Sequence, residues 1–374
     1  MRILFGSAHP YLPQMYGGAQ ASTHELVQRL SARGHTVGVL SGLTGEGWLG
    51  LRSRLLLKLA RRGYVSDESL GYLVFRAWFA QDVVHRVVTD FEADVAIFQS
   101  RLPVPLAQSI DRNATRTFIY LRNVETEDLG GSLEQVPNTG FIANSHFTAQ
   151  RFAETQGISA DVIHPMIEAE KYRVSSTGEN VTFINPHPNK GVDIALKVAE
   201  ACPEIPFVFV RGWGLSPEQE ADLQNNLSRL SNVTLRASTD DMRSVYKNAR
   251  IVLAPSQWEE AFGRIAAEAQ VSGIPVVASK IGGLPEAVGP GGILLEPDAP
   301  VGDWLAAVRG LWCDEQIYSK LSKLALEYSK RPEMNPERQI DRLVEVLDRP
   351  GFVRPPPQDG GGSSFGSAEA GTAV

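Results

Sequence analysis

Short apolar runs rich in Val and Ile alternate along the chain with longer segments of helical periodicity. Apolar runs of strand length are typical of strands that are buried on both faces of a parallel sheet. In the first half these runs are RILFG, HTVGVLSG, DVAIFQ, RTFIYL, GFIANS and ADVIHP. In the second half they are NVTFIN, PFVFVRG, NVTLRA, RIVLAPS, IPVVASK and GGILLEP. This repetition of βα units predicts an α/β fold with two parallel sheets.

Capping residues mark the ends of several predicted helices. One helix is expected between Ser145 and Gly157, and another is expected to end at Gly34. The polar, turn-rich segment 168–180 indicates a domain boundary. We therefore expect one domain over residues 1–168, a second over 169–331, a separate final helix within 332–349, and a disordered Pro-, Gly- and Ser-rich tail over 350–374.

Composition and charge narrow the class of protein. The chain has 374 residues, of which 43% are hydrophobic, so it can bury two cores. Its longest apolar runs fall far short of a membrane span, and a strand at residues 2–6 leaves no room for a signal peptide, so we expect a cytoplasmic protein. The net charge of −7 argues against general affinity for nucleic acid. The two cysteines, Cys202 and Cys313, lack metal-ligand spacing and are expected to be ordinary thiols.

The segment 254–292 carries the densest chemistry. It reads as strand, loop, helix, strand and Gly-rich loop, with Glu260 before the helix and Glu268 about two turns along it. Taken singly, these two residues could be a dipole-complementing acid and a solvated helix residue. The amides expected to be free to bind an anion at this helix start belong to Phe262, Gly263, Arg264 and Ile265.

Two further segments suggest phosphate binding. Lys190 and Gly191 open a predicted helix, where a cation is unfavourable unless an anion accompanies it. A solvated lysine in a turn is the alternative. Gly17 and Gly18 enter the first predicted helix, where glycine allows the backbone to approach a phosphate closely, although many loops contain two glycines. The loop before them lacks the GxGxxG spacing of a dinucleotide site.

Segment 254–292 resembles the donor-binding signature of the retaining glycosyltransferases of family 4, with the pattern PS…E-x-FG…EA…G-x-PV…GG-x-x-E. The resemblance implies a GT-B fold, in which two Rossmann-like domains face each other across a cleft. The N-terminal domain would bind the acceptor, and the final helix would cross back to it. Glu260 would contact the donor sugar, Glu268 the ribose, and Gly17, Gly18 and the amides near Phe262 the sugar and diphosphate.

The same resemblance implies the reaction. A sugar would pass from a nucleoside diphosphate to a carbohydrate, lipid-linked or small-molecule acceptor, with retention at the anomeric carbon and without a bound metal or other cofactor. Negative charge builds on the leaving diphosphate, so Lys190 and the helix amides would stabilise the transition state, and Lys190 and Glu260 are the expected catalytic residues. A donor phosphate oxygen would help take the acceptor proton.

The chain departs from the family pattern at two positions. Asn185 stands where family members commonly carry an arginine, and Gln99 stands on the acceptor side in place of a frequent histidine. Glutamine can hydrogen-bond a sugar hydroxyl but cannot act as a base. Arg211 or Arg264 could supply the missing cation. These departures leave open a nucleotide-sugar epimerase on the same scaffold, or a catalytically silent sugar-binding protein.

Other polar residues are expected to be structural. Asp240 and Asp241 are expected to cap a helix rather than bind a metal. His9, His146 and His164 lie near strand ends and are given no catalytic role. In segment 47–62, leucines and basic residues occupy different helical faces; we expect the leucine face to pack against the N-terminal core, with contact to an anionic membrane or an acidic acceptor as the alternative. The faces consist of Leu51, Leu55 and Leu59, and of Arg54, Lys58, Arg61 and Arg62.

Overall fold

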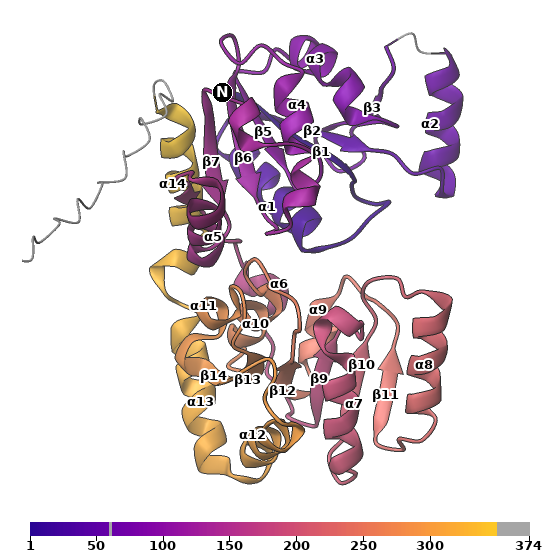
Figure 1. Ribbon diagram of the computed structural model, residues 1–374, viewed down its shortest axis with the longest axis vertical. Coiled ribbons are helices and arrows are strands. Elements are labelled where there is room, and N and C mark those ends of the chain that lie inside the picture. Colours follow the sequence, from indigo (N-terminus) through magenta and orange to yellow (C-terminus); the bar gives the residue numbers. More distant parts are fainter. Residues whose placement is uncertain (60–61, 350–374) are drawn as a thin grey trace, which may run out of the picture.

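The computed structural model describes residues 1–59 and 62–349, which form two α/β domains stacked along the long axis of the molecule (Figure 1). The N-terminal sheet has the strand order β3-β4-β2-β1-β5-β6-β7-β8, and all neighbouring strands are parallel except β3 and β4. Its strands are β1 (Arg2–Pro10), β2 (Thr36–Gly42), β3 (Val65–Asp67), β4 (Leu73–Ala77), β5 (Val95–Gln99), β6 (Arg116–Leu121), β7 (Thr139–Ala143) and β8 (Asp161–Val162).

Helices cover both faces of this sheet. They are α1 (Gly18–Ala32), α2 (Gly47–Leu59), α3 (Ala80–Phe91), α4 (Pro103–Gln108) and α5 (His146–Gln156), with 3-10 turns η1 (Thr126–Leu129) and η2 (Leu133–Gln135). One apolar core joins the sheet to α3, α4 and α5, and a second joins the opposite face to α1. Strands buried between two helical layers need apolar side chains on both faces, which explains the runs in the sequence.

The C-terminal sheet is entirely parallel, with the order β11-β10-β9-β12-β13-β14. Its strands are β9 (Asn180–Ile184), β10 (Phe207–Val210), β11 (Val233–Arg236), β12 (Ala249–Ala254), β13 (Val276–Ser279) and β14 (Gly292–Leu295). Its helices are α6 (Ala169–Tyr172), α7 (Val192–Ala201), α8 (Pro217–Leu227), α9 (Met242–Tyr246), α10 (Arg264–Gln270), α11 (Leu284–Val288), α12 (Val301–Cys313) and α13 (Glu315–Tyr328). Turns η3 (Pro188–Lys190), η4 (Gly289–Gly291) and η5 (Pro332–Met334) complete it. The predicted α/β fold with two sheets is thus confirmed, and the sheets are parallel apart from the β3–β4 pair.

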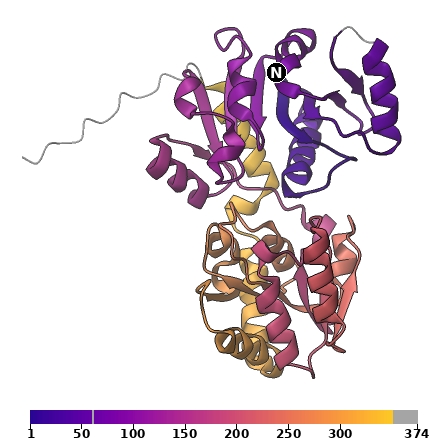
Figure 2. The same ribbon diagram turned by 45° about the vertical axis from the view of Figure 1, so that its right-hand side comes forward.

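The last described helix, α14 (Pro336–Asp348), lies against the N-terminal domain (Figures 1 and 2). Its Ile340 and Leu343 belong to the same apolar core as Ile3 and Phe5 of β1. The first and last described elements, β1 and α14, therefore belong to one domain, and the C-terminal domain lies between them in the sequence. The predicted tail, residues 350–374, lies outside the described residues.

Strands β3 and β4 were not predicted. A charged residue, Arg76, interrupts the apolar pattern of β4, and its side chain is fully buried. Its Nε donates to Asp67 Oδ2 in β3 at 2.7 Å, and its Nη2 donates to the Leu12 carbonyl at 2.8 Å. Burying an arginine is tolerated when its charge is paired with a carboxylate, and the pattern of a single strand does not reveal that partner.

The prediction that the leucine face of residues 47–62 packs against the core is wrong. Leu51 and Leu55 are 58% and 63% exposed, whereas Gly50 and Ser53 of α2 are buried. The smaller side chains let the helix backbone approach the domain closely; a Cβ at Gly50 would lie 2.6 Å from the Thr44 carbonyl oxygen. Arg62 lies beyond the helix, and Arg61 and the Leu59 side chain lie outside the described residues.

Candidate functional site

Two helix N-termini, one from each domain, meet where the domains face each other (Figure 1). Helix α1 begins at Gly18 after the N-cap Gly17, as predicted, and has no capping side chain and no acidic residue in its first turn. A Cβ at Gly18 would lie 3.9 Å from Cδ of Arg264, the first residue of α10. Both helices follow strands of parallel sheets, so the carboxyl edges of the two sheets face the same region, the usual ligand position in such folds.

Lys190 and Glu260, the two expected catalytic residues, form an ion pair. Lys190 Nζ lies 2.9 Å from Glu260 Oε1, and the two side chains are only 16% and 14% exposed. Lys190 ends turn η3 rather than lying in helix α7, which starts after the N-cap Gly191. The structure therefore corrects the electrostatic argument from sequence, because Glu260 already supplies a negative charge to Lys190.

The loops that carry this pair are held together by backbone contacts. Gly191 has φ +77°, and a Cβ there would lie 1.9 Å from the Pro255 carbonyl oxygen, so η3 packs directly on the loop after β12. The Asn189 carbonyl accepts a hydrogen bond from the Gln257 amide at 2.9 Å. These contacts explain how residues 70 positions apart in sequence bring the two side chains together.

The Gly-rich loop 282–283 holds Glu260 from the other side. The Gly283 amide donates to the Glu260 carbonyl at 2.6 Å. Gly282 has φ +59°, and a Cβ there would come within 2.4 Å of the same carbonyl oxygen. The GG of the GG-x-x-E pattern is thus required by close backbone packing against the Glu260 loop.

Aromatic side chains that the sequence reasoning missed lie beside the pair. Lys190 Nζ is 4.8 Å from the centroid of the Trp213 ring, and Trp213 is 44% exposed. The ring centroids of Trp213 and Trp258 are 5.4 Å apart, and Trp258 lies two residues before Glu260 in the sequence. The sequence feature that could have indicated Trp213 is its position shortly after a predicted strand, in VFVRGWG.

Arg264 does not offer a free guanidinium. Its Nη2 donates to both oxygens of Glu25 in α1, at 2.9 and 3.1 Å, and to the Tyr172 hydroxyl, while its Nε donates to Glu268 at 2.7 Å. Burial alone would lower the pKa of this guanidinium, but the carboxylates of Glu25 and Glu268 hold it well above its ordinary value. The guanidinium that was considered as the missing cation is therefore already paired with two carboxylates, and its contact with Glu25 joins the two domains.

Glu268 is buried and is not a solvated helix residue. Its oxygens accept hydrogen bonds from Arg264 Nε and from the Tyr246 hydroxyl at 2.9 Å. Burial raises the pKa of the Glu268 carboxyl, and the nearby Arg264 charge opposes that shift. A carboxylate oxygen can accept more than one hydrogen bond, so these contacts leave capacity for a ligand hydroxyl. Beside it, Phe262 is buried and Gly263 is the N-cap of α10, which places the Arg264 and Ile265 amides in its first turn.

Asn185, which stands where the family commonly has an arginine, and Arg211, a possible substitute for that arginine, also have protein partners. Asn185 adopts φ +67° and its Oδ1 accepts from the Trp213 amide at 2.9 Å, so it shapes the loop after β10. Arg211 donates to both oxygens of Glu220 in α8, at 2.7 and 2.5 Å. That interaction lowers the pKa of Glu220 to about 2. Neither residue brings an unpaired charge toward Lys190.

Arg122, directly after β6, has side-chain donors without partners. Its Nε and Nη2 are buried and have no hydrogen-bond partner, and its Nη1 makes one long contact of 3.4 Å to the Ala19 carbonyl in α1. The guanidinium lies 4.1 Å from the centroid of the Tyr120 ring. Burial lowers its pKa, and the charge of Arg264 lowers it further. A buried cation without an anionic partner beside an uncapped helix N-terminus forms a site suited to an anion.

Gln99, the predicted acceptor-side residue, lines a small hollow at the carboxyl ends of β1, β2 and β5. Its Nε2 donates to Thr23 Oγ1 at 2.7 Å, and its Oε1 is buried without a partner. His9 lines the same hollow, and burial lowers its pKa. Gln99 thus lies behind the start of α1 and bonds to that helix.

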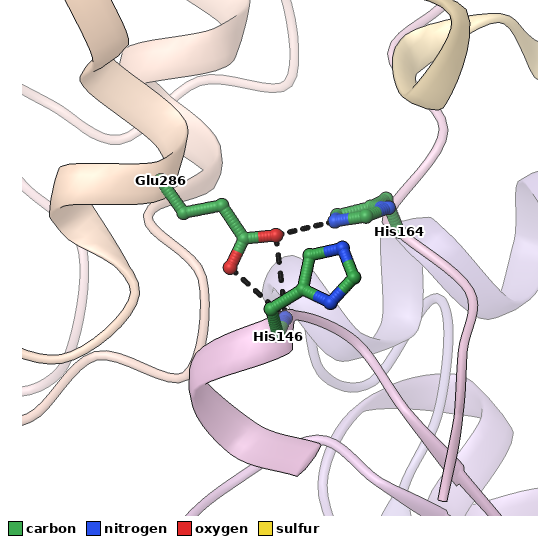
Figure 3. A group of neighbouring side chains, drawn as sticks. All are labelled: His146, His164 and Glu286. Carbon is green, nitrogen blue, oxygen red and sulfur yellow. Dashed lines mark hydrogen bonds and ion pairs between the residues drawn. The ribbon is translucent and has the colours of Figure 1, made fainter. Parts of the chain in front are cut away.

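A second set of contacts between the domains surrounds Glu286, the last residue of the GG-x-x-E pattern (Figure 3). Its carboxylate accepts hydrogen bonds from the His146 amide at 2.9 Å and from the Phe147 amide at the start of α5. It also lies 2.5 Å from His164 Nε2. Although the three side chains His146, His164 and Glu286 are close enough to share a metal ion, the carboxylate is already bonded to a helix N-terminus and an imidazole. His164 thus contacts Glu286 through its imidazole and His146 through its backbone amide, and the absence of a catalytic role for either stays a prediction.

Most of the predicted caps agree with the structure. The Ser145 hydroxyl caps α5, and Gly157 is the C-cap of that helix. Of the two aspartates expected to cap a helix, Asp241 is the N-cap of α9 and accepts from the Ser244 amide, whereas Asp240 precedes the cap. Ser145 and Thr148 also donate to the Ala261 carbonyl in the other domain. Ala261 lies directly after Glu260, so the N-terminal domain contacts the Glu260 loop itself.

Comparison with known proteins finds similarity to glycosyltransferases. Residues 179–314 match the family model described as glycosyl transferases group 1. A D-inositol 3-phosphate glycosyltransferase of Segniliparus rotundus is 30% identical over an alignment of 274 residues, and the match covers 63% of this chain and 59% of that protein. A protein of the same name in Mycobacterium marinum is 33% identical over an alignment of 172 residues, and the match covers 40% of this chain and 36% of that protein. The chain thus aligns with at most about three-fifths of these curated relatives.

Solved structures match over nearly the whole chain. HepE of Anabaena in complex with UDP-glucose has a TM-score of 0.73 at 20% identity, covering 93% of this chain and 99% of that one. WaaG, a glycosyltransferase involved in lipopolysaccharide biosynthesis, has a TM-score of 0.64 at 15% identity, covering 91% and 98%. The fold is GT-B.

Within residues 1–59 and 62–349, no helix combines the length and hydropathy that crossing a bilayer requires.

Proposed function

We propose that this GT-B protein is a glycosyltransferase that transfers a sugar from a nucleoside diphosphate to an acceptor hydroxyl, with retention at the anomeric carbon. The observation that carries the proposal is the Lys190–Glu260 pair, held by packed backbone loops within the matched segment 179–314. The UDP-glucose bound in a structural neighbour supports a nucleotide sugar as the donor class.

Each residue is assigned a chemical role. The bond between the anomeric carbon and the diphosphate oxygen breaks, and the leaving diphosphate takes the electron pair. Lys190 and the first-turn amides of α10 stabilise that charge, and Glu260 accepts hydrogen bonds from the donor sugar hydroxyls. The acceptor hydroxyl attacks the same face of the anomeric carbon, and its proton passes to a phosphate oxygen of the donor. Glu268 accepts hydrogen bonds from the ribose.

Arg122 supplies the second cation that Asn185 cannot. It has two buried nitrogen atoms without partners, whereas Arg211 and Arg264 are paired with carboxylates. It contacts Ala19 in the uncapped first turn of α1, next to Gly18, so a phosphate there would meet both a guanidinium and free amides. This cation comes from the N-terminal domain rather than from the loop after β9, so diphosphate binding would draw the two domains together.

A direct assay tests the reaction. The protein is incubated with a panel of nucleotide sugars, with and without an acceptor, and free nucleoside diphosphate is measured. D-inositol 3-phosphate belongs in the acceptor panel because the curated relatives carry that name, together with carbohydrate and lipid-linked hydroxyl compounds. Release that requires acceptor, with a product that keeps the donor's anomeric configuration by NMR, supports the proposal.

Other results distinguish the alternatives. A sugar isomer formed from the donor alone indicates an epimerase, and tight nucleotide-sugar binding without release for any acceptor indicates a silent binding protein. We propose that the reaction needs no metal, so a chelator should leave the rate unchanged. We also propose that the protein acts in the cytoplasm.

A further inference from the structure

Helix α2 (Gly47–Leu59) has the reverse of the usual polarity of a surface helix. Trp48, Leu51 and Leu55 are 80%, 58% and 63% exposed. Their i, i+3 and i+7 spacing places them on one face of the helix. The residues turned toward the domain are Gly50 and Ser53. A surface helix ordinarily buries its apolar stripe, so this outward stripe has no partner within the described residues.

Basic side chains border the stripe on both sides. At 3.6 residues per turn, Arg52 lies on one side of it, and Arg54 and Lys58 lie on the other. All three are exposed, and none pairs with a carboxylate among the described residues. The sequence from Gly47 to Arg62 contains no Asp or Glu, although the whole chain has a net charge of −7. We refer to Trp48, Leu51, Arg52, Arg54, Leu55 and Lys58 as the α2 surface.

Two more aromatic side chains extend this surface. Trp78 and Phe79, between β4 and α3, are 38% and 63% exposed. The Arg54 guanidinium lies 6.0 Å from the Trp78 ring centroid, which brings that loop next to the helix. Helix α2 stands at the outer edge of the N-terminal domain in both views (Figures 1 and 2), so a large flat partner can reach it.

We propose that the α2 surface binds an anionic lipid bilayer. An apolar stripe of Leu and Trp with basic flanks is the pattern of a helix that lies in the membrane interface, where the apolar side chains enter the acyl boundary and the long basic side chains reach lipid phosphates. A second copy of this chain is a poorer partner. A two-fold interface would place the same arginines and lysine of two α2 helices against one another.

The surface is connected to the proposed catalytic region. Gln14, in the loop after β1, donates from Nε2 to the carbonyls of Thr44 and Glu46 just before α2, at 3.0 and 3.3 Å. The same loop leads to Gly17 and the start of α1. Bilayer binding through α2 would therefore bring the acceptor side of the protein near the membrane, which favours a lipid-linked acceptor. This consequence rests on the proposed function, whereas bilayer binding itself does not.

Vesicle sedimentation with the full chain tests the proposal. The probes are phosphatidylcholine vesicles with and without about 30% phosphatidylglycerol, because each basic residue near an anionic surface contributes about 1 kcal/mol. One variant carries Trp48→Ser, Leu51→Gln and Leu55→Gln, and another carries Arg52→Gln, Arg54→Gln and Lys58→Gln. We expect the unmodified chain to bind anionic vesicles at least tenfold more tightly than neutral ones. Each variant should lose at least tenfold of that affinity.

A matched control changes the same kinds of side chain on α13. Ile317→Gln, Lys320→Gln and Lys323→Gln alter exposed residues of the other domain and should leave vesicle binding unchanged. Thermal unfolding of all variants should match that of the unmodified chain, because every altered side chain is exposed. The proposal is overturned if the unmodified chain does not prefer anionic vesicles, or if both α2 variants bind like it. It is also overturned if the chain is a dimer that the apolar variant converts to monomers, since the occupant is then a second copy.

Discussion

Replacing Lys190 by methionine removes the ammonium group that pairs with Glu260 while keeping an unbranched side chain beside Trp213. At 2.9 Å and an effective dielectric constant of about 20, the Coulomb attraction is about 6 kcal/mol, and desolvation of two mostly buried charges cancels most of it. We expect a net coupling of about 1 to 2 kcal/mol. Lys190→Met should therefore lower the free energy of unfolding by about 1 to 3 kcal/mol, because it leaves the Glu260 carboxylate buried without its partner.

The assay is a double-mutant cycle with Lys190→Met and Glu260→Gln, followed by denaturant unfolding. Lys280 and Glu296 provide a matched control pair, since their Nζ to Oε1 distance is also 2.9 Å but the side chains are 57% and 59% exposed. The coupling of that pair should be below about 0.5 kcal/mol. Equal coupling in the two cycles would refute the argument that burial makes the Lys190 pair strong.

Turnover gives an independent measurement on the same variants. If Lys190 stabilises the leaving diphosphate, Lys190→Met should lower kcat/KM by about tenfold to a thousandfold, equivalent to roughly 1.4 to 4 kcal/mol of transition-state stabilisation. Lys280→Met should have full activity. A Lys190→Met protein that is destabilised but turns over normally would show that this lysine is a structural residue only.

Three further predictions concern carboxylates and arginines near the site. Glu268→Gln should weaken binding of the nucleoside diphosphate in calorimetry, while Glu260→Gln should lower kcat with a smaller loss of that affinity; equal losses would contradict the assigned roles. The pKa of the Glu286 carboxyl lies below its usual value because its bonds to His164 and the α5 amides outweigh the opposing effect of burial. The stability that this carboxylate contributes is therefore present above about pH 4.5, and it is lost as the pH falls through the lower pKa of the folded state. Glu286→Gln should therefore show a smaller drop in unfolding free energy below that pH than the unmodified chain, and parallel curves would argue against it. In calorimetry, Arg122→Met should weaken nucleoside diphosphate binding at least tenfold, which is about 1.4 kcal/mol of binding free energy. Arg211→Met should weaken it less than threefold, which is about 0.65 kcal/mol. The reverse order would refute the assignment of Arg122 as the second cation.

The strands of both parallel sheets could be predicted because burial on two faces demands continuous apolar runs. The Glu260 loop, the α5 cap at Ser145 and the glycine entry to α1 could also be predicted, since each depends on residues adjacent in sequence. Strand β4 was missed because Arg76 interrupts its apolar pattern, and its ion pair with Asp67 is visible only after the sheet forms.

Contacts between the domains could not be predicted from local pattern. Arg264 and Glu25 are 239 positions apart, and no spacing rule indicates that they pair. The same holds for Glu286 and the start of α5, which are 140 positions apart. As a result, Arg264 was considered as a free cation for the diphosphate, whereas the structure binds it to carboxylates and leaves Arg122 with unused donors.

The sequence by itself determined the α/β class, the two sheets and the location of the densest chemistry, because these depend on local burial patterns, capping and the spacing of a contiguous segment. Only the tertiary structure decided which charges are paired and which face of α2 is exposed. A helical wheel shows that Leu51 and Leu55 share a face, but it cannot show that the domain packs against Gly50 and Ser53 instead. That choice depends on how closely the α2 backbone approaches residues 44–45, which is a property of the folded domain.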